Sequence, residues 1–143
     1  MTKKTPRTRV DRREAVGYQS VGAEFMRSAQ LAAGHGYWNA SGLLYVHASI
    51  AYADAVCIAL GGMKSTSDNH VDAVALLGEA AAQTKDRDLA LSHLRRIIEE
   101  KNRVSYTGQS FRERDAGSLA THASRFAGWA ERVLKGVTGG GGA

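Results

Sequence analysis

The residues with the clearest capacity for chemistry lie close together near the end of a predicted helix, in the sequence IEEKNRVSYTG at positions 98–108. This segment brings two cations, an amide, a hydroxyl and a phenol within one or two helical turns. Cations at such a site can bind a phosphate, and an aromatic ring can stack on a base or hydrogen-bond to it. We therefore predict RNA-binding residues here, namely Lys101, Asn102, Arg103, Ser105 and Tyr106.

Asp54 is the only formally charged residue in the apolar stretch 37–60. A carboxylate that is buried without a partner costs free energy. Asp54 can therefore face the solvent, or it can pair with a cation, for which Lys101 and Arg103 are the candidates. In the second arrangement Asp54 stands beside the segment 98–108, and we include it among the candidate RNA-binding residues.

The other motifs predict no metal or nucleotide centre. The five histidines show no metal-ligand spacing with a cysteine or a carboxylate, and Cys57 has no second cysteine with which to form a disulfide. The segment Gly61 to Ser65 lacks the glycine directly before the lysine that a phosphate loop requires, and it follows a predicted helix instead of a strand. We therefore predict no metal site and no cofactor, and a buried apolar role for Cys57.

Composition favours one cytoplasmic domain. The chain has 143 residues, of which 43% are hydrophobic and 23% charged, and it is long enough to bury a core. The first 14 residues hold six Lys or Arg against two acidic residues, which accounts for most of the net charge of +5. Such an arm can contact nucleic acid or remain a solvated terminus. No apolar segment follows it as in a secretory signal.

Five helical patterns follow, at residues 11–33, 37–60, 68–83, 86–104 and 112–135. Apolar residues recur in them every three or four positions, and glycines follow several of them. Ser67 is the predicted N-cap of the third helix, and Ser110 with Glu113 has the form of a capping box before the fifth. No segment alternates as a strand does. We predict an all-α, five-helix up-and-down bundle over residues 11–136, between a disordered basic arm (1–10) and a disordered glycine-rich tail (137–143).

The second pattern, 37–60, is apolar on nearly all sides, which is typical of a central bundle helix or of a membrane span. Polar residues interrupt it throughout, including Asn39, Ser41, His47, Ser49 and Asp54. We therefore predict the central helix of the bundle and no membrane association.

Three segments together resemble the HEPN superfamily of small helical domains, and more narrowly the HEPN-type proteins of actinobacteria. They are the alanine-rich run 46–57 leading to a glycine, the run 68–77, and residues 101–106 followed by a glycine and an alanine-rich last helix. The resemblance covers roughly residues 20–135. It implies a five-helix fold, a homodimer whose motif regions face each other, and a toxin–antitoxin or defence setting with a nucleotidyltransferase-like partner protein.

Many HEPN domains are metal-independent ribonucleases that use an arginine, a polar neighbour and a later histidine. Lys101 matches the basic position, Asn102 matches its neighbour, and the histidine position falls on Ser105 or Tyr106. Neither hydroxyl exchanges a proton near neutral pH as histidine does. We therefore expect a non-catalytic module that binds RNA or a nucleotide. The alternatives are a weak ribonuclease with Lys101, Asn102 and Tyr106 as candidate catalytic residues, and a structural protein partner that binds no nucleic acid.

Overall fold

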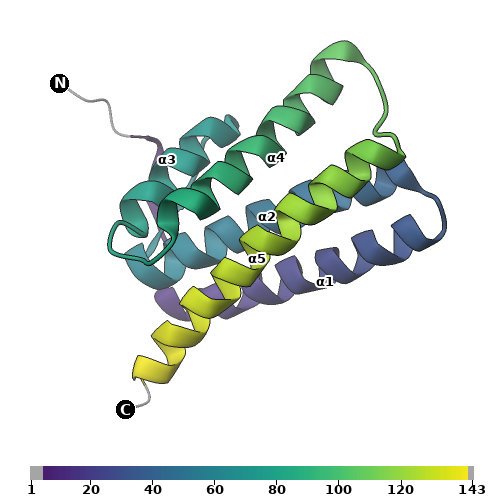
Figure 1. Ribbon diagram of the computed structural model, residues 1–143. Helices are drawn as coiled ribbons and strands as arrows, with labels where there is room; N and C mark the ends of the chain where they lie inside the picture. Colours follow the sequence, from purple (N-terminus) through teal and green to yellow (C-terminus); the bar gives the residue numbers. More distant parts are fainter. Residues whose placement is uncertain (1–4, 142–143) are drawn as a thin grey trace.

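The structure is a computed structural model that describes residues 5–141, with the side chains of that range other than those of Ser105, Tyr106 and residues 138–141. It is an all-α bundle, which confirms the predicted fold class (Figure 1). The helices are α1 (Ala15–Gly34), α2 (Trp38–Gly61), α3 (His70–Ala80), α4 (Arg87–Thr107) and α5 (Glu113–Gly141). The side chains of Ser105 and Tyr106, two of the predicted site residues, therefore lie outside the described residues.

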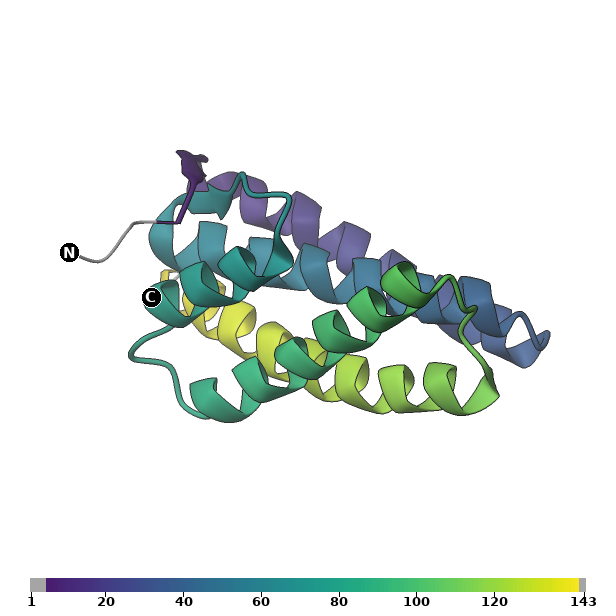
Figure 2. The ribbon, with the colours of Figure 1, turned by 90° about the horizontal axis from the view of Figure 1, so that it is seen from above.

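Two antiparallel helix pairs form the body of the bundle. α1 and α2 lie side by side along their length, and α4 and α5 form the second pair, which packs across α2 through α5 (Figure 1). The shorter α3 fills the space between α2 and α4 at the end that also holds the N-terminal segment, as Figure 2 shows.

α2 is the central helix, as predicted. It contacts all four other α-helices, so apolar residues are needed on every side of it. By length and hydropathy it could cross a membrane, but 67% of its most apolar window is buried inside the protein. This degree of burial fits the core helix of a bundle. Gly62 ends α2 in the left-handed conformation with φ of 63°, which confirms the predicted stop.

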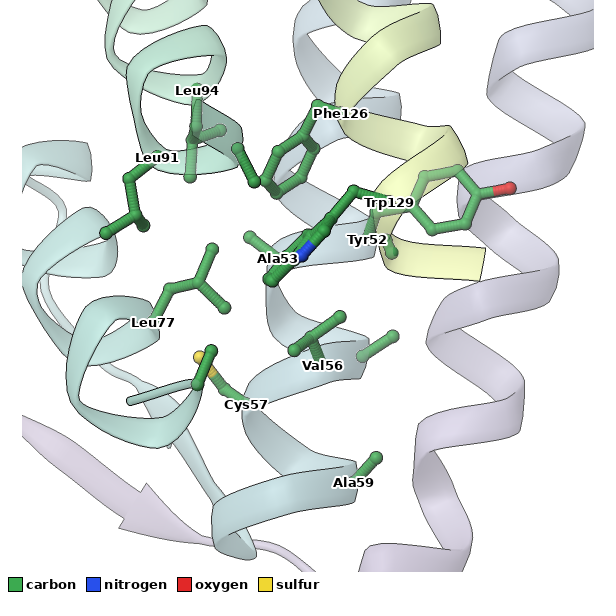
Figure 3. Close-up of a cluster of buried hydrophobic side chains, with 14 of the residues drawn as sticks. Tyr52, Ala53, Val56, Cys57, Ala59, Leu77, Leu91, Leu94, Phe126 and Trp129 are labelled. Carbon is green, nitrogen blue, oxygen red and sulfur yellow. The ribbon is translucent and has the colours of Figure 1, made fainter. Parts of the chain in front are cut away.

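The core forms where three helices converge on α2 (Figure 3). Leu77 of α3, Leu94 of α4 and Phe126 of α5 are each at most 1% exposed. Burying a side chain of this size stabilises the fold by roughly 1.5–3 kcal/mol. Cys57 lies in the same cluster, where burial raises the pKa of its thiol to about 12. Its predicted role as a buried apolar residue is confirmed.

The prediction of a disordered arm over residues 1–10 is wrong for its second half. β1 (Arg7–Arg9) pairs antiparallel with β2 (Met63–Ser65), and the Val10 N–H donates to the Gly62 carbonyl at 2.9 Å. Arg7 adds an ion pair to Glu79 of α3 at 3.0 Å. The prediction that the chain lacks strands is corrected by this short sheet. Three residues are too few to display an alternating pattern, and their partner strand is more than 50 residues away.

Several predicted helix ends are also corrected. A 3₁₀ turn (Arg12–Glu14) precedes α1, and α4 and α5 continue past their predicted ends to Thr107 and Gly141. The expected tail from 137 onward thus begins as helix. Asn69, not Ser67, is the N-cap of α3, because its side chain accepts the Val71 N–H at 3.0 Å.

α5 begins without the predicted capping box of Ser110 and Glu113. Phe111 anchors the chain before α5, because its N–H donates to Asn39 at 3.1 Å and its ring packs on Gly42 of α2. These contacts hold the chain against α2 just before the helix begins. The carboxylate that reaches back to the start of the helix belongs to Asp115, which accepts the Arg112 N–H at 2.9 Å.

Candidate functional site

The predicted site residues on α4 whose side chains are described face two different neighbours, α3 and α5. Consecutive residues of a helix are turned by about 100° around its axis. Asn102 lines a mainly apolar hollow of about 340 Å³ between α3 and α4. Lys101 is half-buried, and after burial itself its charge is the largest cause that lowers the pKa of His70 at the start of α3. Arg103 faces α5. Arg103 therefore does not share a surface with Lys101 and Asn102, which both lie toward α3.

Arg103 is held by acidic neighbours. Its guanidinium pairs with Glu100 on the same helix and with Asp115 of α5 at 3.3 Å, and it donates to the Gln109 side chain at 3.1 Å. Two carboxylates thus neutralise the charge that we expected to be available for RNA. The role of this residue in the structure is to fix the loop between α4 and α5.

Asp54 is half-buried on α2, away from these residues. Burial raises the pKa of its carboxyl to about 6, and the charge of Lys64 in β2 partly opposes that rise. Among the described residues Asp54 forms no ion pair with the expected partners Lys101 and Arg103, and the cation that acts on its carboxyl is Lys64. Lys64 lies after the glycine stop of α2, and the β1–β2 pairing fixes its position.

Two histidines that the sequence analysis did not select meet between α4 and α5. The Nδ1 atoms of His93 and His122 are 2.9 Å apart, and His93 is 9% exposed. One Nδ1 must donate and the other accept, so this contact requires at least one neutral ring. Burial lowers the pKa of both rings, and cationic neighbours add to this, including Arg125 for each of them. The pair is consequently neutral near pH 7.

Two hollows lie on the α4–α5 surface, one on each side of the histidine pair. The Arg125 hollow has a volume of about 240 Å³ and includes His93, Ser124, Arg125, Trp129, Arg132 and Asp86 in its lining. The Arg96 hollow has a volume of about 330 Å³ and includes His122, Arg96, Arg103, Glu99, Glu100 and Ser118. We call the two hollows with the pair between them the α4–α5 groove.

The groove has an internal two-fold pattern that could have been read from the sequence. Both helices carry a histidine followed three residues later by an arginine, His93 with Arg96 and His122 with Arg125. Residues three apart lie on the same side of a helix. Because α4 and α5 are antiparallel, the arginine of each helix lies beside the histidine of the other. Only the pairing of the two helices shows that these repeats meet.

Three arginines of the groove have no ionic partner among the described residues. Arg96, Arg125 and Arg132 form neither an ion pair nor a side-chain hydrogen bond within the part of the chain that the structure describes, whereas Arg103 forms both. Trp129 forms the apolar floor of the Arg125 hollow and is 3% exposed, with its indole N–H donating to the Lys85 carbonyl at 3.0 Å. The groove therefore combines free guanidinium groups with a rigid base.

Anions fit this groove better than cations do. Within the described residues, no three side chains of the metal-binding types come together, and the histidine pair is flanked by arginines. Guanidinium groups bind phosphate and carboxylate oxygens in a planar, two-point geometry.

The resemblance to HEPN domains rests on the sequence segments alone and remains a prediction. No protein-family model, curated protein or solved structure matches the chain.

Proposed function

We propose that the protein is a non-catalytic RNA-binding module that holds a single strand in the α4–α5 groove. The observation that carries this proposal is the set of three unpaired arginines, Arg96, Arg125 and Arg132, around a partly buried histidine pair. The homodimer and the nucleotidyltransferase-like partner that the HEPN resemblance implies stay predictions beside it.

The charge distribution supports an anionic ligand. Cations on one surface repel each other, and binding a phosphate relieves that repulsion and releases counterions. Two hollows in one groove offer places for two phosphates of the same strand. The resemblance to HEPN domains favours RNA over other polyanions. DNA of the same sequence therefore serves as the comparison ligand.

The histidine geometry favours binding over cleavage. Attack by a 2′-hydroxyl requires a base and an acid that reach different oxygens of the reacting phosphate. His93 and His122 instead direct their Nδ1 atoms at each other, at 2.9 Å. Each ring thereby uses one nitrogen on its partner. The pair is suited to holding α4 against α5 at the floor of the groove.

Neighbouring arginines on α4 provide a matched test. Arg96 lines the groove, whereas Arg95 lines the hollow between α3 and α4, and both are exposed. Arg96→Gln is expected to weaken binding of a single-stranded RNA severalfold and to reduce the salt slope by about one unit. Arg95→Gln removes the same charge from a surface outside the groove and should change both quantities less.

The measurement is a calorimetric titration of the purified protein with unlabelled oligoribonucleotides at several salt concentrations. Equal losses for the two variants would reject the α4–α5 groove as the binding surface. Absence of salt-dependent binding to any RNA would reject the proposed function. Cleavage of the RNA that is lost in Lys101→Ala would favour the ribonuclease alternative instead.

A further inference from the structure

The two hollows of the α4–α5 groove differ in charge. The Arg125 hollow holds two free guanidinium groups, those of Arg125 and Arg132, against a single carboxylate, that of Asp86. In the Arg96 hollow, Arg103 is paired with Glu100, so one free guanidinium, that of Arg96, stands against one further carboxylate, that of Glu99. The surplus of positive charge is therefore confined to the Arg125 hollow.

We infer that the Arg125 hollow is a subsite for the terminal phosphate monoester of an RNA strand, which then runs past the histidine pair toward the Arg96 hollow. This inference rests on the proposed function. A phosphate monoester carries about 1.5 to 2 negative charges at pH 7, whereas each internal phosphodiester carries one. Two free guanidinium groups match the monoester, and the single free group of Arg96 matches a diester.

The size and lining of the hollow support a phosphate group. Its volume of about 240 Å³ is below the roughly 300–1,000 Å³ that is usual for sites of whole small molecules. Arg125 and Arg132 supply charged donors, and the Ser124 hydroxyl adds a neutral one. The Nη1 atom of Arg132 lies 3.5 Å from the place that a Cβ on Gly128 would occupy. The lack of a side chain at Gly128 therefore leaves room for the guanidinium group.

The surroundings also favour a strand end over a strand that passes through. The rim of the Arg125 hollow is formed by the start of α4, where Asp86 lines the hollow and Asp88 follows two residues later. A further phosphate beyond this rim would approach the carboxylates of Asp86 and Asp88, of which Asp88 is paired with Arg87 at 2.8 Å. On the opposite side lie the histidine pair and then Arg96. In that direction a strand passes the histidine pair and meets the free guanidinium of Arg96, which lies beside Glu99 and the Arg103-paired Glu100.

The test compares three RNAs of one sequence: one with a 5′-phosphate, one with a 3′-phosphate, and one with hydroxyl groups at both ends. Affinities are measured by titration calorimetry, because this method needs no label on either end of the RNA. One phosphorylated RNA is expected to bind about tenfold more tightly than the unphosphorylated RNA, the effect of one or two charge-assisted hydrogen bonds. Which phosphorylated RNA gains shows which end the hollow accepts.

Variants assign the preference to the hollow. Arg125→Gln and Arg132→Gln should abolish the difference in affinity between the phosphorylated and the unphosphorylated RNA. Arg96→Gln should weaken the binding of all three RNAs and leave the ratio of their affinities unchanged. Both α5 arginines are exposed, so thermal melts should show that these variants remain folded.

The outcomes separate the two proposals. Equal affinity of the wild-type protein for all three RNAs overturns the terminal-phosphate subsite and leaves RNA binding intact. If no RNA binds, the proposed function fails, and titration with a nucleoside monophosphate then decides the subsite. Binding that requires Arg125 and Arg132 would support a monoester site, and no binding would overturn it.

Discussion

Tyr52 donates its hydroxyl hydrogen to Glu131 at 2.7 Å, which joins the central helix α2 to α5. The other carboxylate oxygen of Glu131 accepts from Gln19 of α1 at 2.6 Å. One carboxylate thus ties three helices together. Burial, and then the bond to Glu131, raises the pKa of Tyr52, so the phenol stays protonated as a donor.

Removing the hydroxyl group of Tyr52 should destabilise the protein without changing its fold. Tyr52→Phe leaves the half-buried Glu131 carboxylate with one partner fewer, and hydrogen bonds to charged groups contribute about 1.5–3 kcal/mol. We expect a loss near the lower end of that range in urea unfolding. Tyr18→Phe, on α1, is the control. A loss as large in the control would show that Glu131 is not responsible.

Gly22 on α1 lies directly against the ring of Tyr52. A Cβ at this position would lie 2.8 Å from the ring, closer than packed carbon atoms come. Gly22→Ala should therefore lower the melting temperature. Gly17→Ala in the same helix meets no atom within 4 Å, and it should raise stability by roughly 0.5–1 kcal/mol, because alanine is the better helix former. Stabilisation by both substitutions would contradict the close packing of α1 on α2.

Deleting residues 1–10 should lower stability, because β1 and its contacts are lost. The ion pair between Arg7 and Glu79, whose carboxylate is largely exposed, contributes little, and most of the loss should come from the strand pairing and from Val10, which packs on the core. A deletion of residues 1–4 retains all of these contacts. Calorimetric melting of the two truncated proteins should separate them, and equal melting temperatures would show that β1 adds nothing to stability.

Asp54 should make the protein less stable as the pH rises through about 6. Its carboxyl has a pKa of about 6 in the folded protein against 3.8 as the reference, so the folded state binds the proton more tightly. Its contribution to stability is complete below pH 3.8 and is lost as the pH rises through about 6.

Asp54→Asn should therefore be more stable than the wild type at pH 7.5, by roughly 1–2 kcal/mol, and should lose that advantage at pH 4.5. Chemical unfolding at the two pH values measures the change. A stability difference that is independent of pH would contradict the assignment to this carboxyl.

The histidine pair should produce the opposite dependence at lower pH. The pKa of His93 and that of His122 are lowered from 6.5 by burial and by neighbouring charge, so the unfolded chain binds protons more tightly. Stability is then complete above pH 6.5 and falls as the pH drops below it. His93→Asn should reduce this loss between pH 7.5 and 5.5, relative to the wild type.

His35→Asn is the matched control, because His35 lies exposed at the end of α1 and stacks on Tyr37. This variant should retain the wild-type loss at low pH. If His93→Asn and His35→Asn behave alike, the pair is not the source of the pH dependence.

The amino-acid sequence by itself determined the five helices and the central place of α2. These features depend on local causes: the spacing of apolar residues, the left-handed turn at Gly62, and the apolar residues on all sides of α2. The short pairing of β1 with β2 could not be found in this way, because a three-residue strand is defined by its distant partner.

Only the tertiary structure decided which polar residues share a surface. Asn102 and Arg103 are neighbours in sequence but face α3 and α5 respectively, whereas His93 and His122 are 29 residues apart and in contact. The spacing of histidine and arginine in α4 and in α5 is visible in the sequence. The side chains buried between the two helices set their antiparallel packing and their axial register. This packing brings each arginine to the histidine of the other helix.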